Sequence, residues 1–162
     1  MRTYTDPRQR RVTYESPIGL LAITGVPEGI VSIVPAEKNQ ESSDGPYSCM
    51  QVCVCQLEEY FEGKRTSFDL PLQAQGSAYQ QRIWKRLADV SYGKTSTYSA
   101  LAKSEQTGPR AAGGAVGRNP VAIIVPCHRI VPSGTADRIG GYAWGRERKE
   151  WLLRHEAAVQ RR

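Results

Sequence analysis

The segment Pro126-Cys127-His128-Arg129 places a thiol beside an imidazole. A cysteine attacks as its thiolate, and a nearby imidazolium or guanidinium lowers the thiol pKa. Cys127 is therefore a candidate nucleophile, with His128 as its base and Arg129 adding positive charge. Neighbouring side chains of a strand point to opposite faces, so the pair shares one pocket only if the chain turns after Pro126 or a water bridges the two groups. A bare Cys-His pair is more often a buried structural cysteine beside a hydrogen-bonded histidine.

Two segments must position this pair, and we place their boundary between residues 75 and 76. In residues 1–75, β-rich runs between turn formers predict strands, and apolar residues at helical spacing before Gly63 predict a helix. These expected elements lie at residues 11–16, 20–24, 29–34 and 49–61. Cys49, Cys53 and Cys55 follow no common zinc spacing and have no histidine in their half, so we expect small core residues and no metal there.

Residues 76–162 predict a mostly helical domain. Its first helix opens after Ser77, whose side chain can cap it. Two short helices then flank a tight turn at residues 107–109, which is typical of a helix-turn-helix. The further expected elements are helices at 97–103, 110–118 and 145–160, and a buried strand at 121–125.

The charge of the chain is unevenly spread. The formal net charge is +6 over 162 residues; residues 1–75 carry 7 Lys and Arg against 10 Asp and Glu, whereas residues 76–162 carry 15 against 6. A basic half indicates a polyanionic partner, most often nucleic acid, although a charged surface gives the same count. The longest apolar run, 121–125, is far too short to span a bilayer, so we expect no membrane partner. Four cysteines are too few for a disulfide scaffold, which favours a reducing compartment.

Residues 119–131, Asn-Pro-Val-Ala-Ile-Ile-Val-Pro-Cys-His-Arg-Ile-Val, resemble the signature of the methylated-DNA–protein-cysteine methyltransferases, the 6-O-alkylguanine-DNA alkyltransferases. The resemblance covers nearly all of residues 78–156, through Tyr-Gly-Lys-Thr at 92–95 and Gly-Tyr-Ala-Trp-Gly-Arg at 141–146. The N-terminal segment resembles the small ribonuclease-H-like domain of the family in layout.

The resemblance implies an α+β fold, with a small N-terminal ribonuclease-H-like α/β domain and a mostly helical C-terminal domain with a winged-helix-like helix-turn-helix. It implies direct reversal of DNA damage: the protein binds duplex DNA, flips out a 6-O-alkylguanine and moves the alkyl group onto Cys127 once and irreversibly. No cofactor is expected, since the chain has no phosphate loop or metal constellation. We expect a monomer in the cytoplasm, or in the nucleus of a eukaryote.

The same resemblance implies roles for five catalytic residues. Cys127 is the nucleophile and alkyl acceptor, His128 takes the thiol proton through a water, and Glu156 orients His128. Tyr98 donates a proton or hydrogen bond to a guanine ring nitrogen, and Asn119 braces the active-site turn. Without the resemblance, the last three residues also fit a solvated glutamate at a helix end, a half-buried tyrosine, and an asparagine that only stops a helix before a proline.

The resemblance also implies residues that bind DNA and residues that line the pocket. Arg110 is the finger that fills the gap left by the flipped base, and small side chains beside it permit close approach to the minor groove. The other expected DNA-binding residues are Ala111, Ala112, Gly113, Gly114, Arg118 and Lys94. The expected pocket residues are Arg129, Ile130, Tyr142, Ala143 and Trp144. The family usually has glycine where Trp144 stands, so we expect an altered tolerance of benzyl-type groups.

Two other classes of function compete with this hypothesis. A recognition-only protein would bind the lesion without reacting, although relatives of that kind carry a different residue at the position of Cys127. A cysteine hydrolase would turn over many times and would gain nothing from a finger helix or a basic half.

Overall fold

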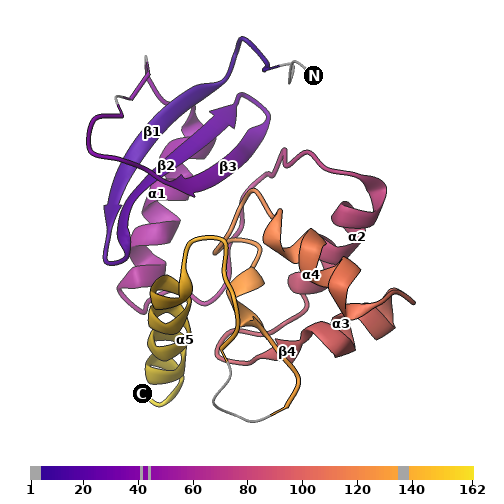
Figure 1. Ribbon diagram of the computed structural model, residues 1–162. Helices are drawn as coiled ribbons and strands as arrows, with labels where there is room; N and C mark the ends of the chain where they lie inside the picture. Colours follow the sequence, from indigo (N-terminus) through magenta and orange to yellow (C-terminus); the bar gives the residue numbers. More distant parts are fainter. Residues whose placement is uncertain (1–4, 41, 44, 135–138) are drawn as a thin grey trace. The chain divides into compact units, whose positions relative to one another are not determined.

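Contacts between Cα atoms divide the chain into two compact units, residues 1–74 and 75–162. The structure, a computed structural model, describes residues 5–40, 42–43, 45–134 and 139–162 (Figure 1). The first unit holds a three-stranded sheet and one helix, and the second unit holds helices with a short two-stranded pairing. The fold is therefore α+β, as the sequence predicted.

The first unit is built on an antiparallel sheet in the order β1-β2-β3. Its strands are β1 (Arg10–Ser16), β2 (Gly19–Val26) and β3 (Gly29–Pro35). Ile23 of β2 stands between Val12 of β1 and Ile33 of β3, so β-branched side chains meet across the sheet. The Ile30 N–H donates to the Pro71 carbonyl, and the Ile30 carbonyl accepts the Gln73 N–H. These bonds satisfy backbone groups at the edge of β3 that does not pair with β2.

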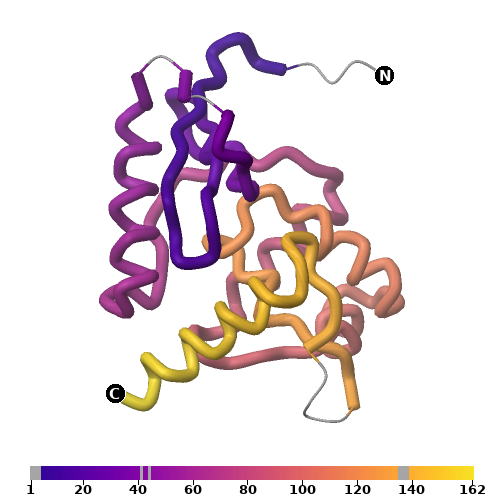
Figure 2. The backbone as a smooth tube through the Cα atoms, turned by 60° about the vertical axis from the view of Figure 1, so that its left-hand side comes forward, coloured from indigo at the N-terminus to yellow at the C-terminus, as the bar shows by residue number. Residues whose placement is uncertain are grey.

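The helix α1 (Ser48–Phe61) lies along one face of this sheet (Figures 1 and 2). A Cβ on Gly25 would lie 2.7 Å from Cγ of Met50, so glycine at this position permits the close approach of α1 to β2. The core face of α1 follows helical spacing. Its buried residues are Met50, Cys53, Gln56, Leu57 and Tyr60.

A helix with a capping box opens the second unit. α2 (Ala78–Leu87) begins at Ser77: the Ser77 side chain accepts the Gln80 N–H, and the Gln80 side chain accepts the Ser77 N–H. Trp84 of α2 is buried, and its indole Nε1 donates to the carbonyl of Ala115 at 2.8 Å. This hydrogen bond attaches α2 to the later helix that carries Ala115.

The helix-turn-helix consists of α3 (Tyr98–Ser104) and α4 (Pro109–Gly117), which lie side by side (Figure 1). Thr97 caps α3 by accepting the N–H of Ala100. Proline stands at the first position of α4, where its missing N–H costs nothing. The residues before α3, β4 (Ser96–Thr97), pair in parallel with β5 (Ile130–Val131).

The predicted buried strand at 121–125 is wrong. The chain makes a turn there, with the Val125 N–H bonded to the Val121 carbonyl, and Ile123 has φ of 74°. A β-branched residue is strongly disfavoured in this left-handed region, so tertiary contacts must hold it. The segment is buried as predicted, but burial comes from the core of the unit and not from a sheet.

The C-terminal helix α5 (Arg146–Gln160) begins one residue after the predicted start. Lys149, Leu152 and Glu156 form its buried face, at a spacing of three and four residues. Two of these three buried side chains, those of Lys149 and Glu156, carry ionisable groups, and both contact residues of the candidate active site. Among the described residues, no helix is long and apolar enough to cross a membrane.

Candidate active site

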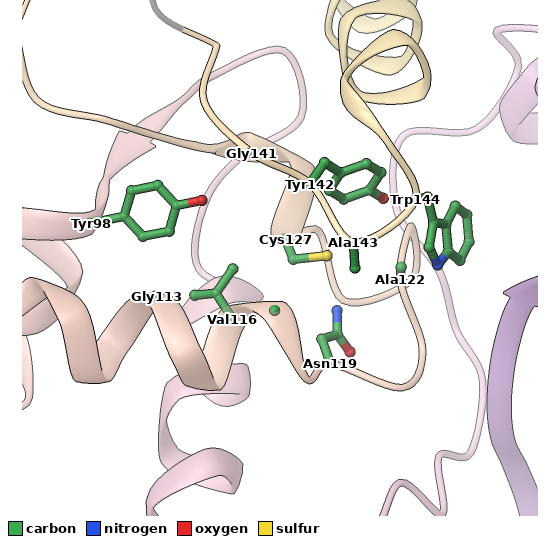
Figure 3. Close-up of a pocket in the computed structure, with 11 residues that line it drawn as sticks. Tyr98, Gly113, Val116, Asn119, Ala122, Cys127, Gly141, Tyr142, Ala143 and Trp144 are labelled. Atoms are coloured by element: carbon green, nitrogen blue, oxygen red, sulfur yellow. The ribbon is translucent and has the colours of Figure 1, made fainter.

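A pocket of about 340 Å³ opens in the second unit with Cys127 among its lining residues (Figure 3). Tyr98 and Trp144 stand on opposite sides of the cysteine in this view. The lining is mainly apolar and comes from α3, α4, the 119–127 segment and the end of the loop before α5. The lining residues are Tyr98, Gly113, Val116, Gly117, Asn119, Ala122, Cys127, Gly141, Tyr142, Ala143 and Trp144.

The chain turns after Pro126, which resolves the geometric question that the Cys-His pair raised. Cys127, His128 and Arg129 form a single turn of 3-10 helix, named η1 (Cys127–Arg129), and the Cys127 N–H is bonded to the Val125 carbonyl at 2.8 Å. Cys127 is 5% exposed and His128 is fully buried. The thiol therefore faces the pocket while the imidazole lies behind it in the core.

Asn119 braces the turn that leads to the cysteine. Its Oδ1 accepts the Val121 N–H at 3.0 Å, and its Nδ2 donates to the Val125 carbonyl at 2.8 Å. These two bonds span the turn that contains the left-handed Ile123. The same amide lowers the pKa of the Cys127 thiol, so one side chain both shapes the turn and favours the ionised sulfur.

Burial raises the pKa of the Cys127 thiol, but polar neighbours oppose that effect. The polar side chains of Asn119 and Tyr142, the backbone of Cys127 and the charge of Lys149 all lower the pKa of the thiol. The net direction is still upward, so the free protein holds a neutral thiol at pH 7. Reaction then needs a base within reach.

His128 is the candidate base, and Glu156 holds its imidazole in place. Nε2 of His128 lies 2.7 Å from Oε1 of Glu156, and both side chains are fully buried. Burial lowers the pKa of His128 below its ordinary value, against the opposing pull of Glu156, so the imidazole is neutral at pH 7. A proton on Nε2 satisfies the carboxylate and leaves the lone pair on Nδ1, which is buried and has no hydrogen-bond partner among the described residues.

Glu156 accepts hydrogen bonds from Arg129 and Gly93 as well as from His128. Its two oxygens accept hydrogen bonds from Nε and Nη2 of Arg129, each at 3.0 Å, and from the Gly93 N–H at 3.1 Å. Burial alone would raise the pKa of Glu156, but the hydrogen bonds and charges of His128 and Arg129 outweigh it and bring the pKa to about 2. The carboxylate is therefore ionised in the core, and the alternative of a solvated glutamate at a helix end is wrong.

Two of the predicted pocket residues do not line the pocket. The Arg129 guanidinium turns away to Glu156 and to the Val90 carbonyl, at 2.7 Å for the latter, because a buried charge must find partners. The Ile130 side chain is fully buried. Tyr142, Ala143 and Trp144 do line the pocket as predicted.

Tyr98 and Lys149 are two further ionisable groups whose charge state is coupled to that of the sulfur. Burial, and then the charge of Cys127, raise the pKa of the Tyr98 hydroxyl, which keeps it a proton donor at pH 7. Nζ of Lys149 lies 5.9 Å from the centre of the Tyr98 ring, and the lysine is fully buried. No sequence motif singles out Lys149; its spacing from Leu152 and Glu156 is the one signal that could have found it on the core face of α5.

The predicted DNA-binding residues of α4 fall into two sets. Arg110, Ala111, Gly114 and Arg118 are exposed, as is Lys94 before β4. Ala112 is fully buried, so its assignment to the DNA-binding surface is wrong; its methyl group packs in the core. Gly113 lines the pocket, and a Cβ there would lie 3.6 Å from the Tyr98 ring.

Two family models match the chain. The model of the 6-O-methylguanine DNA methyltransferase DNA binding domain matches residues 78–158, and that of the ribonuclease-like domain of the same methyltransferase matches residues 10–74. Together they account for both compact units of the structure.

Curated relatives and solved structures agree. A methylated-DNA–protein-cysteine methyltransferase of Methanosarcina acetivorans is 38% identical over 90% of this chain and 96% of its own length. The crystal structure of the Mycobacterium tuberculosis O6-methylguanine methyltransferase matches with a TM-score of 0.82 and 34% identity, over 93% of this chain and 94% of that one. A structure of the Mycobacterium tuberculosis protein in complex with DNA matches with a TM-score of 0.81 and 36% identity, over 91% and 92%. With both units matched in sequence and in fold, the chain belongs to the 6-O-methylguanine DNA methyltransferase family.

Proposed function

We propose that this protein repairs DNA by moving the alkyl group of a 6-O-alkylguanine onto Cys127, once per molecule. The observation that carries the proposal is the arrangement around Cys127: a thiol at a pocket wall, followed by a buried, neutral imidazole that an ionised carboxylate holds in place. The curated relatives bear the name of this activity, which supports it.

The proposed step moves one proton and one alkyl group. Nδ1 of His128 takes the thiol proton through a water, and Glu156 stabilises the imidazolium that results. The Cys127 thiolate attacks the alkyl carbon in line, so the S–C bond forms as the O–C bond at guanine position 6 breaks. The electron pair passes into the guanine ring, and Tyr98 supplies a proton or hydrogen bond to a ring nitrogen so that the base leaves neutral. The imidazolium of His128 then releases the proton it took from the thiol, which restores Tyr98, so the net result is one proton and one alkyl group moved.

The thioether that forms cannot donate its alkyl group back under these conditions. Among the described residues, no second thiol lies in the pocket to exchange with Cys127. Each molecule therefore acts once, and the reaction is stoichiometric. This separates the proposal from a cysteine hydrolase, which must release its product and turn over.

We propose that α4 delivers the base to this pocket. Exposed Arg110 lies at the second residue of α4, and Gly113 and Gly117 of the same helix line the pocket, so the surface that meets DNA and the pocket share one element. Unstacking a base costs a few kcal/mol, and a guanidinium in the gap offsets part of that. Exposed Lys94 and Arg118 add phosphate contacts that favour no sequence.

The test is intact mass after incubation with a duplex oligonucleotide that carries one 6-O-methylguanine. We expect a gain of one methyl group that saturates at one per chain and is absent in Cys127→Ser. Tight lesion-dependent binding without a mass change would replace the proposal with the recognition-only function, and repeated turnover would replace it with hydrolysis.

A second test addresses Arg110. Arg110→Ala should slow transfer from the duplex by about tenfold or more, because unstacking is no longer offset. Transfer from the free base 6-O-benzylguanine should stay unchanged, since no base has to leave a stack. Arg82→Ala, on the exposed face of α2, is the matched control. Sedimentation of the free protein tests the proposed monomer.

A further inference from the structure

The turn between α3 and α4 contains a residue in a disfavoured conformation. Gln106 has φ of 56°, in the left-handed region where glycine is the usual residue after a helix. The N–H groups of Gln106 and Thr107 are bonded to the carbonyls of Lys103 and Ala102, so α3 ends in a Schellman motif without its glycine. A residue with a long side chain keeps this conformation only where its surroundings fix the chain.

The residue before Gln106, Glu105, is attached to α2 by two arginines. Its carboxylate accepts Nε–H of Arg86 at 2.9 Å and Nε–H of Arg82 at 3.2 Å. The Glu105 side chain is 11% exposed, so its charge needs such partners. The hydrogen bond from Arg86 is the largest influence on the pKa of Glu105, which it lowers. Arg86 is therefore the main partner, and the carboxylate keeps it when Arg82 is lost.

The residue after Gln106, Thr107, is attached to the same face of α2. Its hydroxyl oxygen lies 2.9 Å from the Tyr79 hydroxyl oxygen, and the two groups share a hydrogen bond. Tyr79 and Arg86 are about two helical turns apart, so their side chains lie on one face of α2. The disfavoured residue of the turn is thus held on both sides by one helix.

This turn leads directly into α4, the helix that carries Arg110. The N-cap residue of α4 is Gly108, which has no side chain to accept the first N–H groups of the helix. The later part of α4 is already attached to α2, through the Trp84 indole and the Ala115 carbonyl. The contacts of the turn therefore fix the other end of α4, where Arg110 lies.

We propose that Tyr79, Arg86 and Glu105 are positioning residues that fix the direction in which α4 presents Arg110 to the duplex. The inference rests on the proposed function and deepens it, since it says what holds the finger before a base leaves the stack. A guanidinium offsets the cost of unstacking only when it reaches the gap. A turn that moves freely would spread Arg110 over many positions, and the entropy of ordering it would then oppose flipping.

The first experiment compares two substrates in Glu105→Ala and Tyr79→Phe. Transfer from a duplex with one 6-O-methylguanine should slow about fivefold in Glu105→Ala and about threefold in Tyr79→Phe, as expected for loss of such polar contacts. Transfer from the free base 6-O-benzylguanine should keep the wild-type rate, because no base has to leave a stack. That rate also verifies that each variant is folded.

The controls are an exposed glutamate, in Glu147→Ala, and a tyrosine of the first unit, in Tyr14→Phe. Both should keep the wild-type rate on either substrate. Equal slowing on duplex and free base would show that Glu105 and Tyr79 serve only the fold. A wild-type rate on the duplex in both variants would overturn the proposal as well.

The second experiment asks whether the effect passes through Arg110. In a protein that already carries Arg110→Ala, Glu105→Ala should slow duplex transfer no further, because the side chain that it positions is gone. Effects that multiply would refute the positioning role and leave the finger intact. A wild-type duplex rate in Arg110→Ala alone would refute the finger itself, and this inference with it, so the two failures are distinguishable.

Discussion

Cys53 and Cys127 are both buried cysteines, yet their surroundings make them chemically opposite. Cys53 lies in the core face of α1, and burial, with a smaller contribution from the charge of Cys49, raises its pKa to about 12. Burial raises the pKa of Cys127 too, but Asn119, Tyr142 and Lys149 counteract it. Cys127 also lines a pocket, and Cys53 does not line that pocket. Burial alone makes a thiol inert; polar neighbours and an opening to substrate make it a nucleophile.

The largest effect tests that contrast directly. Cys127→Ser should abolish the mass gain on methylated duplex, because an alcohol in the same place is a far weaker nucleophile. Cys53→Ala should keep full transfer and lower the free energy of unfolding by about 1 kcal/mol, through lost packing. Intact mass and urea unfolding measure the two effects. Loss of transfer in a folded Cys53→Ala protein would contradict the division of roles.

The next effect removes the carboxylate behind the base. Glu156→Gln should slow transfer on the order of a hundredfold, since the imidazolium loses its stabilising charge. Single-turnover kinetics with saturating duplex measure this. Rates within a factor of about two of wild type would show that Glu156 serves the fold and not the base.

Glu156 also predicts how stability depends on pH. Its pKa is about 2 in the folded protein against 4.5 for the free group, so its stabilisation is complete above about pH 4.5 and is lost as pH falls toward 2. The shift corresponds to about 3 kcal/mol over that window. Urea unfolding between pH 6 and 2 should show this loss in the wild type. The control Glu147→Gln, an exposed glutamate at the start of α5, should leave the slope unchanged.

These residues show how far sequence patterns reach. Helical spacing and capping residues predicted α1, α2 and the two helices of the helix-turn-helix, because their signals are local. The prediction of a strand at 121–125 is wrong, because Ile123 adopts a left-handed conformation. Only the Asn119 brace and the packing around the turn explain that conformation. Propensity carries no information about such a tertiary constraint.

The site divides in the same way. Cys127 and His128 are adjacent in the sequence and could be found from it. The partner of Arg129 could not be found from the sequence, because Glu156 lies 27 residues away on another helix. The sequence analysis therefore assigns Arg129 to the pocket, which is wrong. Lys149 escapes sequence analysis because a lysine normally indicates a solvated surface, and only its helical spacing from Leu152 and Glu156 indicates the core face of α5.

A smaller effect isolates one polar neighbour of the sulfur. Tyr142→Phe keeps the ring in the pocket wall and removes a buried hydroxyl whose effect on Cys127 is to lower the thiol pKa. The thiol pKa should rise, and its reaction with iodoacetamide at pH 8 should slow several-fold and recover at higher pH. Tyr14→Phe, in the first unit, is the control. An unchanged pH profile would remove Tyr142 from the groups that distinguish Cys127 from Cys53.

The most selective effect concerns the opening of the pocket. The Trp144 ring lies 5.9 Å from the Tyr142 ring at a tilt of 56°, and both side chains line the pocket. An indole at this edge offers aromatic surface to a benzyl group and little to a methyl group. Such contacts contribute roughly 0.5–1.5 kcal/mol, so Trp144→Gly should lower the ratio of benzyl to methyl transfer by roughly two- to tenfold. Trp144→Phe should retain most of the ratio. Competition between 6-O-benzylguanine and 6-O-methylguanine duplexes measures it, and an equal ratio in Trp144→Gly and wild type would show that the indole only closes the pocket wall.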